Sequence, residues 1–173
     1  MKTIVILAHP NIEQSTVNKT WVDALSKNSA EVGVHDIYKT YPDWNIDVAA
    51  EQQLLEKYDR IVFQYPIYWY NMPPLLKKWF DEVFAYGWCY GANGDKLEKK
   101  NIGLVVSTGG VEGAYTKEVY GEISTFVKQI EATAKFVRAN FDSFHVFHGA
   151  LSPDASERLG KNTEEYLQYV TKA

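Results

Sequence analysis

The chain has 173 residues, of which 46% are hydrophobic, with a net charge of −4 and one cysteine. A chain of this length forms one domain by default, and we expect a single domain over residues 1–173. The acidic balance and the lack of a basic stripe argue against a nucleic-acid binder. The lone cysteine, Cys89, excludes an internal disulfide and a cysteine-based zinc site, and it favours a reducing cytoplasm.

The N-terminal residues, MKTIVILAHP, contain an apolar run too short for a signal peptide or a membrane span. We interpret Ile4–Ala8 as a central parallel strand that is buried on both faces. Ser15 or Thr16 is suited to cap the following helix, which runs through Trp21 and Leu25.

The next segment predicts an outer strand over Val32–Ile37, a loop over Thr40–Ile46 and a helix over Asp47–Lys57. In that helix, one face is predicted to carry Ala50, Leu54 and Leu55.

The stretch from Asp59 to Phe84 stands out. Ile61–Phe63 is typical of a buried strand, and Pro73 and Pro74 suit the first turn of a helix. The helix has apolar residues at helical spacing: Leu75, Leu76, Trp79, Phe80, Val83 and Phe84. Its polar side includes Asp81 and Glu82, which we interpret as surface residues. The connection Pro66–Met72 carries three consecutive aromatic residues where a short polar loop is normal, so we expect a flat ligand to cover them.

The C-terminal half continues the alternation. Tyr86–Asn101 predicts a loop, Ile102–Val106 a buried strand and Ser107–Gly110 a turn. The segment Lys117–Asn140 is predicted to contain at least one helix, with Ile130, Ala134 and Val137 on one face. A last strand, Phe144–His148, precedes a terminal helix that Asp154 and Glu157 are expected to cap.

Strands and helices alternate throughout, which predicts an α/β fold with a parallel sheet between helices. Five strands in this length favour the flavodoxin-like arrangement, with strand order 2-1-3-4-5 and helices on both faces.

Ligands of open α/β sheets bind outside the carboxyl ends of the strands, at the point where the strand order reverses. The loops after the first, third and fourth strands should therefore share one crevice. The first of these loops suggests an anion site, because Ser15 and Thr16 supply hydroxyls and the helix N-terminus supplies free N–H groups. It matches neither the Walker nor the G-x-G-x-x-G pattern, which favours a monophosphate ester.

The other two loops add aromatic faces and a glycine turn, Gly109-Gly110, that lets backbone approach a ligand closely. A phosphate at one end and a flat ring at the other describe a flavin nucleotide. The alternatives are that Ser15 and Thr16 are only caps, that Trp69 is core and that the glycines form only a turn.

At these residues the chain resembles the flavodoxin-like NAD(P)H:quinone oxidoreductases, in particular the bacterial group that includes ancillary subunits of glutathione-gated potassium efflux systems. The resemblance rests on LAHP (residues 7–10) with STVN (15–18), YPDWNIDVAAEQ (41–52), PIYWYNMPPLLK (66–77), GWCYG (87–91) and STGG (107–110).

The resemblance implies FMN as the cofactor, with FAD as the alternative, and NAD(P)H as co-substrate. It also implies a homodimer whose pockets the partner chain completes, with the loop around Trp88 and Tyr90 as a candidate interface. The cofactor-binding residues implied are His9, Ser15, Thr16, Val17, Asn18, Ile67, Tyr68, Trp69, Tyr70, Ser107, Thr108, Gly109 and Gly110.

The chain departs from its relatives in three places. Tyr68 stands where many have Gln, and Ser107 where many have Thr. Some relatives use a Tyr and a His as a proton relay. Tyr115 fits the Tyr position, but Gly121 lies where the His is expected, so Tyr115 alone is the candidate catalytic residue.

Other chemistries are disfavoured. His145 and His148 are three residues apart on a strand and should face opposite sides, so we predict no metal site. The strand–Ser–helix elbow of hydrolases is missing, and Cys89 suits a small buried filler.

We therefore predict a cytoplasmic FMN-dependent NAD(P)H:quinone oxidoreductase that transfers a hydride through the flavin N5 position to a quinone-like acceptor. The alternatives are a regulatory subunit of a membrane potassium efflux antiporter, peripheral at the inner face of the cell membrane, and a flavodoxin-type electron carrier.

Overall fold

The computed structural model describes residues 1–29 and 31–172. Within those residues, five strands form a parallel sheet in the order β2-β1-β3-β4-β5, which confirms the predicted flavodoxin-like fold. The strands are β1 (Thr3–Leu7), β2 (Val32–Asp36), β3 (Arg60–Pro66), β4 (Asn101–Ser107) and β5 (Asn140–Phe147).

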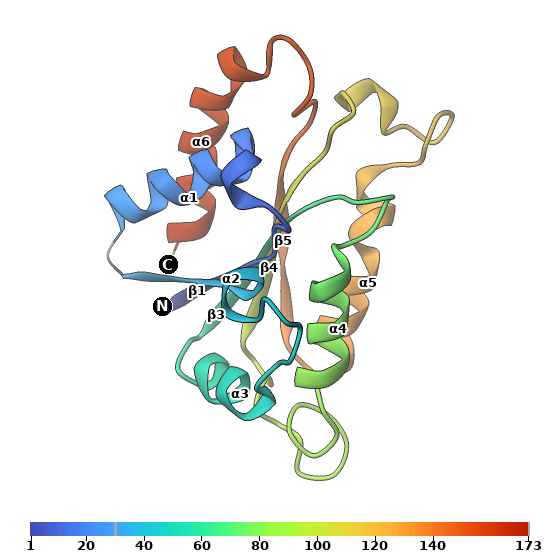
Figure 1. Cartoon of the computed structure of the whole chain (residues 1–173). Helices are drawn as coiled ribbons and strands as arrows, with labels where there is room; N and C mark the ends of the chain where they lie inside the picture. The colour runs from blue at the N-terminus through green and yellow to red at the C-terminus, as the bar shows by residue number, and fades with distance from the viewer. Residues whose placement is uncertain (30, 173) are drawn as a thin grey trace.

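Helices cover both faces of this sheet. Figure 1 shows α1 and α6 on one side and α4 and α5 on the other. The α-helices are α1 (Thr16–Asn28), α2 (Ile37–Thr40), α3 (Val48–Glu56), α4 (Pro74–Val83), α5 (Ile123–Phe136) and α6 (Ala155–Thr171). Two 3₁₀ turns, η1 (Ile12–Gln14) and η2 (Glu112–Ala114), lie in the connections after β1 and β4.

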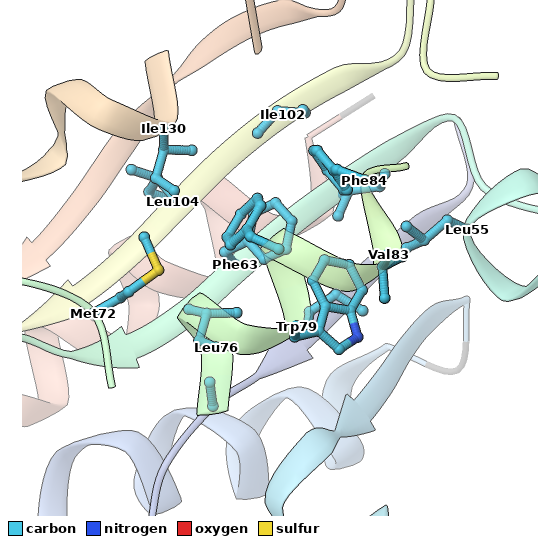
Figure 2. Close-up of a cluster of buried hydrophobic side chains, with 14 of the residues drawn as sticks. Leu55, Phe63, Met72, Leu76, Trp79, Val83, Phe84, Ile102, Leu104 and Ile130 are labelled. Atoms are coloured by element: carbon cyan, nitrogen blue, oxygen red, sulfur yellow. The ribbon is translucent and has the colours of Figure 1, made fainter. Parts of the chain in front are cut away.

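The central strands are buried on both faces, so alternate residues feed two separate cores. On the α4 and α5 side, Phe63 of β3 packs edge-on against Trp79 of α4 with ring centroids 5.7 Å apart (Figure 2). On the α1 and α6 side, Val62 of the same strand packs with Trp21 and Tyr166. The continuous apolar runs of the sequence thus reflect burial from two directions.

The end of β2 differs from the prediction, because Ile37 belongs to the short helix α2 and not to the strand. Asp36 caps this helix: its Oδ1 accepts from the backbone N–H groups of Tyr38 and Lys39, both at 3.1 Å. A side chain that satisfies two free helix donors makes the turn into a helix favourable.

The buried face of α3 also differs from the prediction. Ala50 is exposed, and Glu51 is buried beside Leu55. Glu51 accepts hydrogen bonds from Tyr41 Oη at 2.6 Å and Trp79 Nε1 at 2.7 Å, and it pairs with His35 Nε2 at 2.7 Å. A pattern of apolar residues does not reveal Glu51 as buried, because hydrogen bonds from three partners compensate the cost of burying its charge.

The helix starts follow prediction at α4 but not at α6. Pro74 occupies the first position of α4. At α6, Asp154 stands at the N-cap but accepts no backbone N–H there; it accepts instead from Ser152 Oγ at 2.6 Å and Arg158 Nε at 2.8 Å. The expected capping box with Glu157 is therefore wrong.

Across the described parts of the chain, no helix is both long enough and apolar enough to span a bilayer.

Candidate functional site

The loops that follow β1, β3 and β4 meet at the carboxyl edge of the sheet. Backbone hydrogen bonds extend the strand pairing into them: Ala8 N donates to Gln64 O at 2.9 Å, and Ile67 N donates to Ser107 O at 2.8 Å. Thr108 N donates to Phe147 O at 2.9 Å and joins the loop after β5. The three loops predicted to share a crevice are therefore held side by side.

A cavity of about 400 Å³ opens between these loops. It is lined by the predicted residues His9, Ser15, Thr16, Val17, Asn18, Ile67, Tyr68, Ser107, Thr108 and Gly109, together with Asn11, Gln14, Pro66, Ala150 and Leu151. Trp69, Tyr70, Gly110 and Tyr115 lie outside this lining. Cofactor binding by these residues remains a prediction.

One end of the cavity is the N-terminus of α1. Ser15 is the N-cap, and its Oγ accepts from Asn18 N at 3.1 Å. The first N–H groups of a helix have no partner within the helix, so the amides of Thr16 and Val17 are available to a ligand. The helix dipole adds partial positive charge at the same point, which favours an anion.

His9 adds a defined donor to this end. Its Nδ1 accepts from Asn11 N at 3.1 Å, so in the neutral ring the proton resides on Nε2. Burial lowers the pKa of His9, against the opposing effects of Asp36 and Asn11. The ring is therefore neutral at pH 7 and presents an N–H donor.

Among the described residues, those that line the cavity include no Lys, Arg, Asp or Glu. An anion bound here would be held by N–H groups, hydroxyls and the helix dipole. This donor set suits one phosphate group better than a highly charged polyphosphate.

The loop after β3 contains a strained turn. Tyr68 and Asn71 exchange backbone hydrogen bonds of 2.8 and 3.0 Å, and the two residues between them, Trp69 and Tyr70, have φ of 47° and 63°. A tight turn of this kind normally carries Asn or Gly, because left-handed backbone costs other residues about 1–2 kcal/mol each. Two bulky aromatic residues in this position point to a function that offsets the strain.

The side chains of this turn form an exposed aromatic surface. Trp69 is 93% exposed, so it is not a core residue. The ring of Tyr70 lies 5.1 Å from that of Phe126 and 6.0 Å from that of Tyr120, between centroids. A flat ligand at the cavity mouth would have aromatic faces available from this side.

The loop after β4 places Tyr115 beside the glycine turn. A Cβ on Gly110 would lie 3.4 Å from the Tyr115 hydroxyl, so the hydroxyl lies close to this glycine. The ring of His148, the first residue after β5, lies 5.0 Å from the Tyr115 ring, between centroids. His148 also contacts Thr108, with 3.0 Å between Nδ1 and Oγ1.

His148 is the main residue of this site that the sequence interpretation missed. The sequence presents it only as half of an H-x-x-H pair, whereas in the structure His145 has a different partner, Asn162, at 3.0 Å. Ala150 and Leu151, which line the cavity, were also missed. All three follow β5, and the carboxyl end of a parallel strand next to β4 was the available signal.

The loop around Trp88 and Tyr90 stays a predicted interface, but its two named aromatic residues are not its most exposed ones. Trp88 is buried in the chain's own core, and its Nε1 donates to Glu56 at 2.9 Å. Tyr90 is half-buried, and the exposed aromatic residue of this loop is Tyr86. Cys89 is buried as expected, which raises the pKa of its thiol to about 11.

Residues 1–170 match a known protein family that is described as having a flavodoxin-like fold. General stress protein 14 and the uncharacterized NAD(P)H oxidoreductase YrkL, both of Bacillus subtilis (strain 168), are 45% and 43% identical. The alignments cover 98% and 100% of this chain and 97% and 99% of those proteins. The ancillary protein KefF of the glutathione-regulated potassium-efflux system of Citrobacter koseri is 38% identical over 95% of this chain and 93% of its own.

Two solved structures agree over almost the whole chain. General stress protein 14 of Treponema denticola, in complex with FMN, is 42% identical with a TM-score of 0.92, and 98% of each chain is covered. An NADPH-quinone reductase from P. pentosaceus is 32% identical with a TM-score of 0.87, covering 100% of this chain and 99% of the other. The chain therefore belongs to the flavodoxin-like family that includes these oxidoreductases and the potassium-efflux ancillary protein.

Proposed function

We propose that the protein is an FMN-dependent NAD(P)H:quinone oxidoreductase that works as one flavodoxin-like domain. The observation that carries the proposal is one cavity that is lined both by the N-terminus of α1, which suits an anion, and by Tyr68, the first residue of the aromatic turn. The FMN complex of the Treponema relative and the names of the oxidoreductase and quinone reductase relatives support it.

The residues present fit FMN. The free amides of Thr16 and Val17, with the Nε2–H of His9, suit its phosphate. Ile67 and Tyr68, with the strained turn at Trp69 and Tyr70, suit one face of its ring. The remaining predicted contacts come from Ser15, Asn18, Ser107, Thr108, Gly109 and Gly110. When bound, FMN supplies two-electron transfer between NAD(P)H and an acceptor.

The fit favours FMN over FAD. The cavity of about 400 Å³ offers one anion end, formed without any lysine or arginine among the described residues that line it. A dinucleotide would need a second phosphate partner and a place for its adenine.

In this proposal Tyr115 is the group nearest to the reacting acceptor. Its hydroxyl lies over the glycine turn, from where it donates a hydrogen bond to a quinone oxygen. His148 packs against its ring and restricts its orientation, and the Tyr70–Phe126 pair borders the same space. The acceptor would thus be a flat molecule with a carbonyl oxygen.

Two partner proposals accompany the enzyme. The exposed Tyr70 and Tyr120, whose ring centroids are 6.0 Å apart, and the exposed Val119 support a homodimer in which the partner chain covers these side chains. The KefF relative supports a second candidate function, a regulatory subunit of a potassium efflux antiporter. We place the protein in the cytoplasm because its one cysteine is buried and unpaired, as suits a reducing compartment.

The deciding experiment is the absorbance spectrum of the purified protein, with identification of the released flavin and initial rates of NADPH and NADH oxidation with a benzoquinone. We expect FMN and a ping-pong pattern, because donor and acceptor would occupy the same site in turn. A colourless protein that binds no added flavin would refute the function. A normal spectrum without quinone turnover, and co-purification with the antiporter, would favour the regulatory subunit.

A further inference from the structure

A chain of buried hydrogen bonds leads from the last helix to the cavity. Tyr166 of α6 donates to Gln64 Oε1 at 2.9 Å, and Gln64 Nε2 lies 3.4 Å from Asn18 Oδ1. Asn18 Nδ2 donates to Ser107 Oγ at 2.9 Å. At most 4% of any of these four residues is exposed, so water cannot replace the missing partner if one bond is lost.

One backbone carbonyl determines the donor and the acceptor of each hydrogen bond in this series. Gln64 Nε2 lies 3.3 Å from the main-chain oxygen of Asn18, which can only accept. The amide of Gln64 must therefore turn its NH₂ group toward Asn18 and its oxygen toward Tyr166. Asn18 in turn presents its oxygen to Gln64 and its NH₂ group to Ser107.

The series of hydrogen bonds ends at the hydroxyl of Ser107, which lines the cavity. Ser107 Oγ already accepts from Asn18, and its own hydrogen has no acceptor among the described residues. The hydroxyl is thus left as a donor at the cavity wall. Burial raises the pKa of Tyr166, so its hydroxyl keeps its proton and remains the first donor of the series.

We propose that Gln64 and Tyr166 are positioning residues that hold Ser107 as a hydrogen-bond donor toward an acceptor atom of the bound ring. The inference rests on the proposed function for the identity of the ligand. A Ser107 donor selects for a ring with a carbonyl oxygen or an unprotonated nitrogen at this point. The hydrogen bonds couple α6, through Gln64 of β3 and Asn18 of α1, to Ser107 at the end of β4.

The structure offers a matched control on the same helix. Tyr169 of α6 is also buried in large part; its hydroxyl donates to Ser143 O at 2.8 Å and accepts from Leu104 N at 3.0 Å. Neither partner lines the cavity. Tyr166→Phe keeps the ring that stacks on Trp21 with centroids 5.3 Å apart, so both variants remove a hydroxyl and retain packing.

The test measures the FMN dissociation constant of the flavin-free protein by fluorescence quenching for the wild type, Tyr166→Phe, Ser107→Ala, the double variant and Tyr169→Phe. Loss of one hydrogen bond predicts about three- to tenfold weaker binding for Tyr166→Phe and Ser107→Ala. The double variant should bind no more weakly than Ser107→Ala, because Tyr166 acts through Ser107. Tyr169→Phe should bind FMN as the wild type does.

Unchanged FMN affinity in Tyr166→Phe, or fully additive losses in the double variant, would overturn the inference and leave the proposed function standing. A wild type that binds no FMN would overturn both. If Tyr166→Phe does not fold, Gln64→Met replaces it, since Met has similar length but cannot donate to Asn18. The same non-additivity with Ser107→Ala is then expected, and additive losses would again overturn the inference.

Discussion

The ring of His148 lies against that of Tyr115, with centroids 5.0 Å apart and planes inclined by 35°, although 33 positions separate the two residues in the chain. Thr108 defines the tautomer of this histidine. Its Oγ1 donates to Gly110 O at 2.8 Å, so it accepts from His148 Nδ1–H and leaves Nε2 without a proton. Burial lowers the pKa of His148, so the ring beside Tyr115 is neutral at pH 7.

Replacing Tyr115 tests the acceptor step. Tyr115→Phe removes the hydroxyl but keeps the ring contacts with His148 and Phe126. We expect quinone turnover to fall about 100-fold or more, since a positioned proton donor contributes roughly 10²- to 10⁴-fold, while FMN affinity stays unchanged. Rapid-mixing measurement of the acceptor half-reaction checks this, with Tyr120→Phe as the control. Equal rates for Tyr115→Phe and the wild type would remove Tyr115 from the chemistry.

His9 should make FMN binding depend on pH. Because burial lowers the pKa of the free ring, protonation occurs below the ordinary value of 6.5. A bound phosphate favours the charged ring and raises this pKa, so His9 strengthens binding increasingly as pH falls below neutrality. His9→Gln keeps a donor but cannot titrate. The affinity ratio of wild type to His9→Gln should rise between pH 7.5 and about 6. A constant ratio would mean that His9 does not contact the phosphate.

Ser15 is expected to act both as cap and as ligand. Ser15→Ala should lower the free energy of unfolding by about 1 kcal/mol, the usual cost of a lost N-cap, and weaken FMN binding about three- to tenfold. Asp47→Ala is the matched control, because Asp47 caps α3 through Ala50 N at 3.0 Å, away from the cavity. Urea unfolding and FMN titration check both variants. If Asp47→Ala weakens FMN binding equally, the effect is one of stability alone.

Glu51 should govern part of the acid sensitivity. Burial acts to raise its pKa, but hydrogen bonds from His35, Tyr41 and Trp79 outweigh burial and hold the pKa below the ordinary 4.5. Its stabilising contribution is therefore complete above pH 4.5 and lost as pH falls through the lowered pKa. Glu51→Gln should cost about 2 kcal/mol at pH 7, and it should flatten the fall in the free energy of unfolding below pH 4.5.

The control for Glu51 is Glu56→Gln. Glu56 is exposed and accepts one indole bond, from Trp88 at 2.9 Å. Glu56→Gln should lower the free energy of unfolding by well under half as much. It should leave the fall in stability at low pH unchanged. Equal costs for the two variants, measured by urea unfolding from pH 3 to 7, would contradict the assignment of Glu51 as a buried carboxylate.

The strain at Trp69 predicts a conflict between stability and function. Trp69→Gly relieves the left-handed backbone and removes a side chain that is 93% exposed, so the free energy of unfolding should stay equal or rise by up to about 1 kcal/mol. FMN affinity should fall, and the KM for the quinone should rise.

Trp44 provides the comparison for Trp69, since it also has positive φ, of 64°, but packs on Tyr38 away from the cavity. Trp44→Gly should leave FMN affinity and KM unchanged. If Trp69→Gly also changes neither, the aromatic turn has no part in binding.

Local patterns in the sequence predicted much of the fold and part of the site. The apolar run at β1, the Ser15 cap and the paired prolines of α4 each express a preference of a few neighbouring residues, and the structure agrees with all three. The cavity could be located because parallel strands bring their carboxyl ends together, whatever their side chains.

The failures arose where a polar group found a partner far along the chain. The predicted buried face of α3 did not include Glu51, because a carboxylate is rarely buried, and its partner Trp79 lies 28 residues away. The contact of His148 with Tyr115 likewise arises only from the fold, because the two residues are far apart in the sequence.

By itself, the sequence determined the alternation of strands and helices, their order in the sheet and the edge at which a ligand can bind. Only the tertiary structure decided which buried donors meet which acceptors, as at Tyr166 and Gln64, 102 residues apart. Periodicity and capping act between near neighbours along the backbone. The partner of a buried polar group depends instead on how distant elements pack, because that packing decides which groups are sealed from water together.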